Sequence, residues 1–196
     1  EKAFEEETKN PPAVFWEKFS QFQVRYLLAQ AKDLKSFYEF RVALKHLLEQ
    51  RYEEAAQQFQ TLILKFPYPY IQGDATYRLG LAYYFQKRFL DAEKKFAEVI
   101  QNYPETTIHL DASAFFHALC AFQLQQYETA LKRFDLFLEY FPDSNKWNTA
   151  WYWKGIAYLE QHQEEKAEIC LKQVLQISEH PKRRDALEQL AKLKQK

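Results

Sequence analysis

Histidines, cysteines and neighbouring carboxylates are the side chains here that could do metal or acid–base chemistry, and their spacing does not suit either. The five histidines form no H-x-x-x-H or H-x-x-E-H pair, the spacing with which one helix face presents two zinc ligands. The sequence also contains no glycine-rich phosphate loop and no nucleophile elbow. We therefore expect no catalytic residue, no metal site and no cofactor, so that the protein is not an enzyme.

The individual polar candidates have structural explanations. Glu53-Glu54 and Glu164-Glu165 stand where helices are expected to begin, and negative charge there complements the helix dipole. His46 takes a place in its repeat that tyrosines take in two others, so we expect a packed imidazole. Cys120 and Cys170 could join neighbouring repeats as a disulfide, but we favour buried free thiols.

Aromatic residues are the other group whose number and spacing carry information, and they indicate contact rather than catalysis. They make up 17% of the chain. Four times, an aromatic or acidic residue is followed by Ala three positions later and by a bulky apolar residue seven later, and three times by Pro fifteen later. The copies are Tyr52-Ala55-Phe59-Pro67, Phe89-Ala92-Phe96-Pro104, Tyr127-Ala130-Phe134-Pro142 and Glu164-Ala167-Leu171.

These copies are 37 or 38 residues apart, and a fixed period of this size is typical of a solenoid built from one repeated unit. Each copy would form the second helix, helix B, of a helical hairpin that ends near its proline. Small residues recur in the preceding helix A as well, where close helix crossing requires them. These are Ala43, Gly80, Ala118 and Gly155.

The chain at this point resembles the tetratricopeptide repeat family. The family's order of aromatic, Leu, Gly, Tyr, Ala, Phe and Pro is matched by Tyr77, Leu79, Gly80, Tyr83, Ala92, Phe96 and Pro104. The resemblance implies an all-α fold, a right-handed superhelical solenoid of about four helix-turn-helix repeats. We place the repeats at 36–72, 73–110, 111–147 and 148–180.

The two ends are expected to carry capping helices. Residues 1–35 contain a periodic apolar segment, Val14 to Leu34, behind Pro11-Pro12. It is either a helix that covers the open end of the solenoid or one that lies in the groove as an internal ligand. Residues 181–196 contain an apolar pattern typical of a C-terminal capping helix.

The resemblance also implies where partners bind, because in this fold the first helix of each repeat lines the concave face. The predicted partner-binding residues are Phe40, Tyr77, Tyr84, Phe115, Phe122, Tyr152 and Leu159. Some of these rings must pack within the chain, but together they exceed what four hairpins need. We expect a non-enzymatic scaffold that binds protein or peptide segments in an aromatic groove.

The links after the prolines suggest a bacterial setting for such a scaffold. Asn102-Tyr-Pro-Glu-Thr-Thr and Tyr140-Phe-Pro-Asp-Ser-Asn are similar to links in two cell-envelope groups of the family. These groups are the lipoprotein of the outer-membrane β-barrel assembly machinery and the periplasmic partner of the Tol-Pal system. The resemblance implies a periplasmic or cell-envelope scaffold, with a leader or lipid anchor possible upstream of Glu1.

Other function classes are distinguished by charge and hydropathy. Acidic and basic residues number 27 each, so nucleic acid has little electrostatic attraction to the chain. No apolar stretch is long enough to span a membrane. The alternative that stays open is a cytoplasmic co-chaperone or secretion chaperone. The carboxylate-gripping form of that class is disfavoured, since only Arg41, Arg78 and Lys154 lie near the relevant face.

Overall fold

The computed structural model describes residues 34–67, 69–176 and 181–193, and within these ranges every regular element is an α-helix. The helices of the four hairpins are α3 (Leu34–Leu48), α4 (Tyr52–Lys65), α5 (Pro69–Phe85), α6 (Phe89–Asn102), α7 (Leu110–Gln123), α8 (Tyr127–Tyr140), α9 (Trp147–Glu160) and α10 (Glu164–Val174). They are followed by α11 (Arg183–Leu193). The predicted all-helical repeat solenoid is confirmed.

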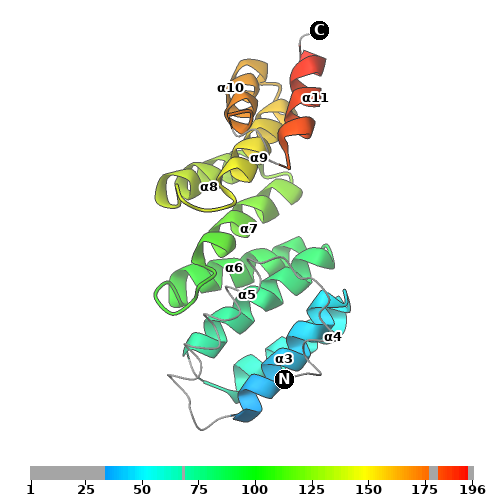
Figure 1. Ribbon diagram of the computed structural model, residues 1–196, viewed down its shortest axis with the longest axis vertical. Helices are drawn as coiled ribbons and strands as arrows, with labels where there is room; N and C mark the ends of the chain where they lie inside the picture. The colour runs from blue at the N-terminus through cyan, green and yellow to red at the C-terminus, as the bar shows by residue number, and fades with distance from the viewer. Residues whose placement is uncertain (1–33, 68, 177–180, 194–196) are drawn as a thin grey trace.

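The hairpins stack along the long axis of the molecule, from α3 and α4 at one end to α10 and α11 at the other (Figure 1). Each helix of the four hairpins packs against the next one in sequence. The first helices of neighbouring hairpins also touch, α3 with α5 and α7 with α9. We call the surface made by α3, α5, α7 and α9 the helix-A face.

Small residues sit where the two helices of a hairpin cross, as predicted. Ala55, Ala92, Ala130 and Ala167 are all completely buried. A Cβ added to Gly80 would lie 2.8 Å from Cε1 of Phe96, and one added to Gly155 would lie 3.0 Å from Leu171. The large side chain of helix B therefore fills the space that the small residue of helix A leaves open.

Each hairpin turns through a residue in the left-handed conformation, and none of the four is glycine. Their φ values are 61° for Gln50, 63° for Lys87, 60° for Gln125 and 57° for His162. At the second turn Lys87 N–H donates to Tyr84 O, and Arg88 N–H donates to Tyr83 O. The same pair of bonds recurs at all four turns and closes each helix A in a Schellman motif.

The prolines mark helix ends as expected. Helices α4, α6 and α8 stop two residues before Pro67, Pro104 and Pro142. Beyond the last hairpin, Ala186 and Leu190 of α11 are buried in a cluster with Tyr152 and Leu171. Helix α11 thus covers the end of the array. The segment predicted to form the N-terminal helix lies outside the described residues, apart from Leu34.

Both cysteines are free and buried, as favoured from the sequence. Burial raises the pKa of the Cys120 thiol to about 12 and that of Cys170 to about 11. Since the thiolate is the reactive form, both side chains behave as small apolar groups at neutral pH.

Candidate functional site

Four of the seven predicted partner-binding residues belong to the core of the chain. The exposed fractions are 1% for Phe40, 7% for Tyr77, 5% for Phe115 and 9% for Tyr152. Their rings pack within the solenoid: Phe40 meets Phe59 edge-on at 5.6 Å. This placement differs from the expectation, because the neighbouring helix B covers this side of helix A. In this structure these four side chains present almost no surface to a partner.

The other three, Tyr84, Phe122 and Leu159, are half-buried and occupy the last turns of α5, α7 and α9. Ring contacts connect this row from one hairpin to the next. Tyr84 meets Phe116 of α7 with centroids 5.3 Å apart, and Phe122 meets Trp153 of α9 at 5.0 Å. We call Tyr84, Phe122 and Leu159, together with Phe116 and Trp153, the helix-A row.

Sequence reasoning missed Phe116 and Trp153, although both sit one residue after a predicted position. Phe85, also missed, is 47% exposed and stacks on Tyr52 of α4 at 5.2 Å. Burial raises the pKa of Tyr84 further above neutral pH, to about 12, and its protonated hydroxyl is a hydrogen-bond donor. The row therefore offers aromatic surface together with the polar groups of Tyr84 and Trp153, which suits recognition of a peptide.

Polar contacts join α5 to the link before α7. Thr107 Oγ1 donates to Asp74 Oδ1 at 2.7 Å, and Thr107 Oγ1 accepts from His109 N–H at 3.1 Å. Tyr77 stacks on the His109 ring, with centroids 4.3 Å apart. Desolvation lowers the pKa of Arg78 and raises that of Tyr77. These contacts hold the link in place, and the link sets the direction in which α7 begins.

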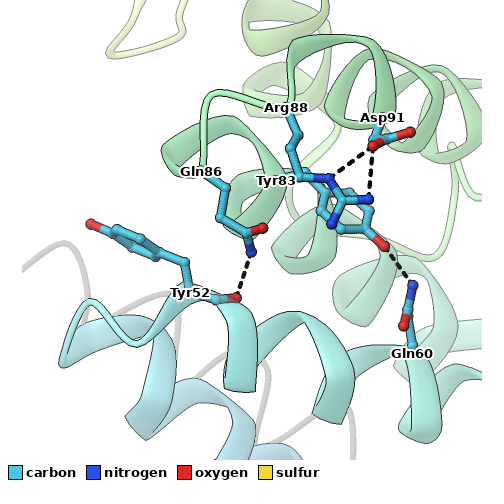
Figure 2. Close-up of polar contacts among 6 residues, drawn as sticks. All are labelled: Tyr52, Gln60, Tyr83, Gln86, Arg88 and Asp91. Carbon is cyan, nitrogen blue, oxygen red and sulfur yellow. Dashed lines mark hydrogen bonds and ion pairs between the residues drawn. The ribbon is translucent and has the colours of Figure 1, made fainter.

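The other side of the solenoid consists of three junctions, each formed by one helix A and the two helices B that flank it. We name each junction by its helix A. The α5 junction is filled by Tyr83, whose ring lies under Arg88 with the guanidinium carbon 4.3 Å from the centroid (Figure 2). Gln60 Nε2 donates to the Tyr83 hydroxyl at 2.5 Å, and Arg88 Nε donates to Asp91 at 2.9 Å. Large side chains and hydrogen bonds thus occupy this junction.

The α9 junction is also filled. Trp151 lies under Lys154, with the ammonium nitrogen 4.7 Å from the ring centroid. Lys154 Nζ forms an ion pair with Asp135 Oδ1 of α8 at 2.5 Å. Tyr158 occupies the place of Tyr83 in the repeat register and lies under Lys166 at 5.6 Å.

The α7 junction is open, and it holds a cavity of about 620 Å³. The repeat register explains the space. Ala97 stands where Gln60 and Asp135 stand in the other junctions, and Ala114 stands where Thr76 and Trp151 stand. The lining comes from α6, the link after it, α7, α8 and the residue after α8: Ala97, Ile100, Gln101, Pro104, Leu110, Ala114, His117, Arg133, Leu136, Phe137, Tyr140 and Phe141. We call this cavity and its rim the α7 groove.

Polar groups of the α7 groove are few. Arg133 forms an ion pair with Glu93 of α6 at 2.5 Å and donates to the backbone oxygen of His117 at 3.1 Å. Desolvation and the nearby Arg133 charge lower the pKa of His117 to about 4, against a smaller opposite effect of Glu93. The imidazole is therefore neutral at physiological pH. The groove presents a mainly apolar surface whose charged lining residue, Arg133, is paired with Glu93, and Leu136 and Tyr140 are 52% and 68% exposed.

Within the described ranges no group of three or more His, Cys, Asp or Glu side chains could hold a metal ion. None of the helices described there has the length and apolar character that crossing a bilayer requires. The surfaces that remain as candidate sites are the helix-A row and the α7 groove, and both are suited to contact with another molecule.

Comparisons with known proteins agree with this geometry. Sequence models of the tetratricopeptide repeat match residues 40–105, 117–144 and 149–181, which together make up more than half of the chain. No curated protein matches.

Solved structures share the fold at low sequence identity. One is YrrB, described as a TPR protein with an unusual peptide-binding site, with 16% identity, a TM-score of 0.65, and coverage of 91% of this chain and 86% of that one. A Podosopora anserina putative kinesin light chain with nearly identical TPR-like repeats has 17% identity, a TM-score of 0.65, and coverage of 81% and 84%. MamA from Desulfovibrio magneticus RS-1 has 18% identity, a TM-score of 0.64, and coverage of 83% and 94%.

Proposed function

Because the chain belongs to the tetratricopeptide repeat family, we propose that it is a scaffold that binds segments of partner proteins along its helix-A face. The observation that carries this proposal is the helix-A row, in which half-buried aromatic side chains of three hairpins touch one another. Aromatic rings that are held rigid by neighbours lose little entropy on binding and act as anchors. The peptide-binding site described for one structural neighbour, YrrB, agrees with this proposal.

The test is to replace Tyr84 and Phe122 together by Ala and to measure binding of peptides selected from a random display library against the full chain. Anchors of this kind contribute about 2 kcal/mol or more when truncated. The double variant should therefore lose roughly a hundredfold in affinity, since 2.7 kcal/mol is already two decades. Its helical circular dichroism should stay near that of the parent.

Leu64→Lys on α4 is the matched control, because Leu64 is 85% exposed and far from the row in sequence. If the double variant folds and still binds the selected peptides, partner binding on the helix-A row is wrong. If the double variant fails to fold, Leu159→Ser tests the same row with a smaller change, and unchanged affinity there contradicts the proposal.

A cell-envelope setting is a further part of the proposal and is supported by the link sequences after Pro104 and Pro142. The type of the β-barrel assembly lipoprotein or of the Tol-Pal partner rests on those links alone. Cell fractionation with an antibody against the chain tests the setting. Recovery with the envelope fraction supports it, and recovery with the cytosol supports the chaperone alternative.

The carboxylate-gripping chaperone has little geometric support. Lys154 forms its ion pair with Asp135, and Arg78 lies 5.5 Å from the ring centroid of Phe40 and within 3.4 Å of His109 Nε2. Arg41 lies 5.9 Å from the Phe37 ring centroid. Basic side chains that pack on rings and pair with carboxylates in this way do not form a shared anion site.

A further inference from the structure

The α7 groove is a second candidate surface, which shares helix α7 with the proposed peptide site but none of the residues of the helix-A row. We propose that it is a binding site in its own right and that its occupant is an amphipathic α-helix of a partner protein. This inference does not depend on the helix-A row, because the groove is lined by α6, α7 and α8 on the side where helices B flank helix A.

The groove differs from its two equivalents in a way that favours a ligand. The α5 and α9 junctions close themselves with Tyr83 under Arg88 and with Trp151 under Lys154. In the α7 junction Ala97 and Ala114 line a cavity instead. Solvated apolar surface of this kind is unfavourable for an isolated chain, and a partner that covers it gains the corresponding free energy.

The charges that line the groove determine which side chains an occupant can present to it. Arg133 is the only charged residue in the lining, and it is already matched by Glu93. A charged anchor entering the groove would be desolvated without a counter-ion, at a cost of several kcal/mol. The occupant must therefore present bulky, uncharged side chains to Ile100, Leu110 and Leu136.

Hydrogen bonding decides the backbone conformation of the occupant. The walls are helices whose backbone groups are paired internally, so the groove offers no sheet edge. Besides Arg133, the side chains with strong hydrogen-bonding groups in the lining are Gln101, His117 and Tyr140. An extended peptide would bury N–H and C=O groups without enough partners, whereas a helix satisfies its own.

The length of the groove fits a short stretch of helix. Its wall on α8 runs from Arg133 to Tyr140, which is about 10 Å at 1.5 Å per residue. This is roughly two helical turns. A partner helix with apolar residues at i, i+4 and i+7 would place them along this wall.

The experiment uses the full chain and a fluorescent synthetic helix of Ala, Glu and Lys that carries Leu at i, Phe at i+4 and Leu at i+7. Two control peptides have Ser at the three apolar places or Pro in the middle. We expect the helical peptide to bind at least about tenfold more tightly than either control, since each decade corresponds to 1.4 kcal/mol. Equal binding of the proline peptide would contradict a helical occupant, and failure of the helical peptide to bind would contradict the site.

Two lysine substitutions locate the contact. Leu136→Lys places a charge on the groove at a residue that is 52% exposed, and Leu64→Lys makes the same change on α4 outside it. Leu136→Lys should weaken binding of the helical peptide about tenfold or more, while Leu64→Lys should change its affinity less than twofold. Tyr140→Lys, at a residue 68% exposed, repeats the test if Leu136→Lys perturbs the helical signal.

The remaining outcomes separate the possible occupants. Equal effects of the two lysine variants would overturn the groove as the site. If the Tyr84 and Phe122 double variant no longer binds the helical peptide while Leu136→Lys still does, the peptide binds the helix-A row and the groove is wrong as its site. Sedimentation that shows a dimer which Leu136→Lys converts to a monomer would identify a second copy of the chain as occupant and contradict a partner helix.

Discussion

The α5 and α7 junctions occupy equivalent places in the repeat, yet the first is filled by side chains and the second holds a cavity. Around α5, Tyr83 fills the junction and is held by Gln60 and Arg88 (Figure 2). Around α7, Ala121 stands in place of Tyr83, and Ala97 in place of Gln60. The crossing alanines, the left-handed turns and the prolines are the same in both.

The difference shows that the residues that recur in each repeat determine the backbone arrangement but not whether a junction is filled by side chains. A few side chains that do not take part in the hairpin crossing decide whether a junction is closed or open. Within one solenoid, a junction filled by side chains contributes stability, whereas the open junction leaves apolar surface that we propose a partner helix covers.

Tyr83→Ala should open the α5 junction at a high cost. The substitution removes a ring that is 5% exposed, together with its contacts to Arg88 and Gln60. Truncation of a buried aromatic side chain costs about 3–5 kcal/mol. Chemical denaturation should show this loss, and a variant with nearly the stability of the parent would mean that the α5 junction does not depend on Tyr83.

Ala92→Leu and Ala130→Leu should each cost about 1–3 kcal/mol through overpacking of a hairpin crossing. Both residues are completely buried, one in the α5–α6 hairpin and the other in the α7–α8 hairpin. Similar losses in thermal unfolding would agree with a crossing that the two repeats share. A variant as stable as the parent would contradict the register.

Acid should weaken the α7 junction through His117. The pKa of His117 falls from 6.5 to about 4 on folding, because burial and Arg133 disfavour the charged imidazole. The unfolded chain therefore binds the proton first, so stability is full above pH 6.5 and decreases as the pH falls toward 4. We expect this single group to account for about 1–3 kcal/mol of the loss.

His117→Gln is the control for the pH prediction, since it keeps a neutral polar side chain that does not titrate. Unfolding free energies measured between pH 7 and pH 4 should fall less steeply for this variant than for the parent. Identical slopes would show that the His117 environment is the same in the folded and unfolded chain.

Lys87→Gly should raise stability by about 1 kcal/mol, because the φ of 63° at this turn is strained for any residue with a Cβ. Lys94→Gly in the interior of α6 is the matched control and should lower stability by about the same amount. A loss in both variants would mean that the turn conformation carries no strain that glycine relieves.

Much of the fold follows from the sequence because its signals are local. Ala55, Ala92, Ala130 and Ala167 recur at one spacing, and a small residue at a helix crossing has a single physical reason. The turns gave no comparable signal, since Gln50, Lys87 and Gln125 are not types that prefer the left-handed region. Only the register of the flanking helices locates them.

The candidate site was harder to predict because it depends on which side of helix A is covered. Tyr77 and Tyr84 are both aromatic residues of α5, yet one is in the core and the other half-buried. The α7 groove was missed altogether. Its signal was present in the sequence as Ala97 and Ala114, which line the groove and stand where the other repeats have larger residues.

The most direct test is methyl nuclear magnetic resonance of the full chain during titration with the helical Leu and Phe peptide. The account predicts that signals of Ile100, Leu110, Ala114 and Leu136 shift, because these residues line the α7 groove. Signals of Ile63, Leu64 and Leu79, which take the places of Ile100, Gln101 and His117 in the repeat around α5, should stay unchanged. Shifts at the α5 junction, or an α7 groove unmoved while the peptide binds elsewhere, would contradict the division between a closed and an open junction.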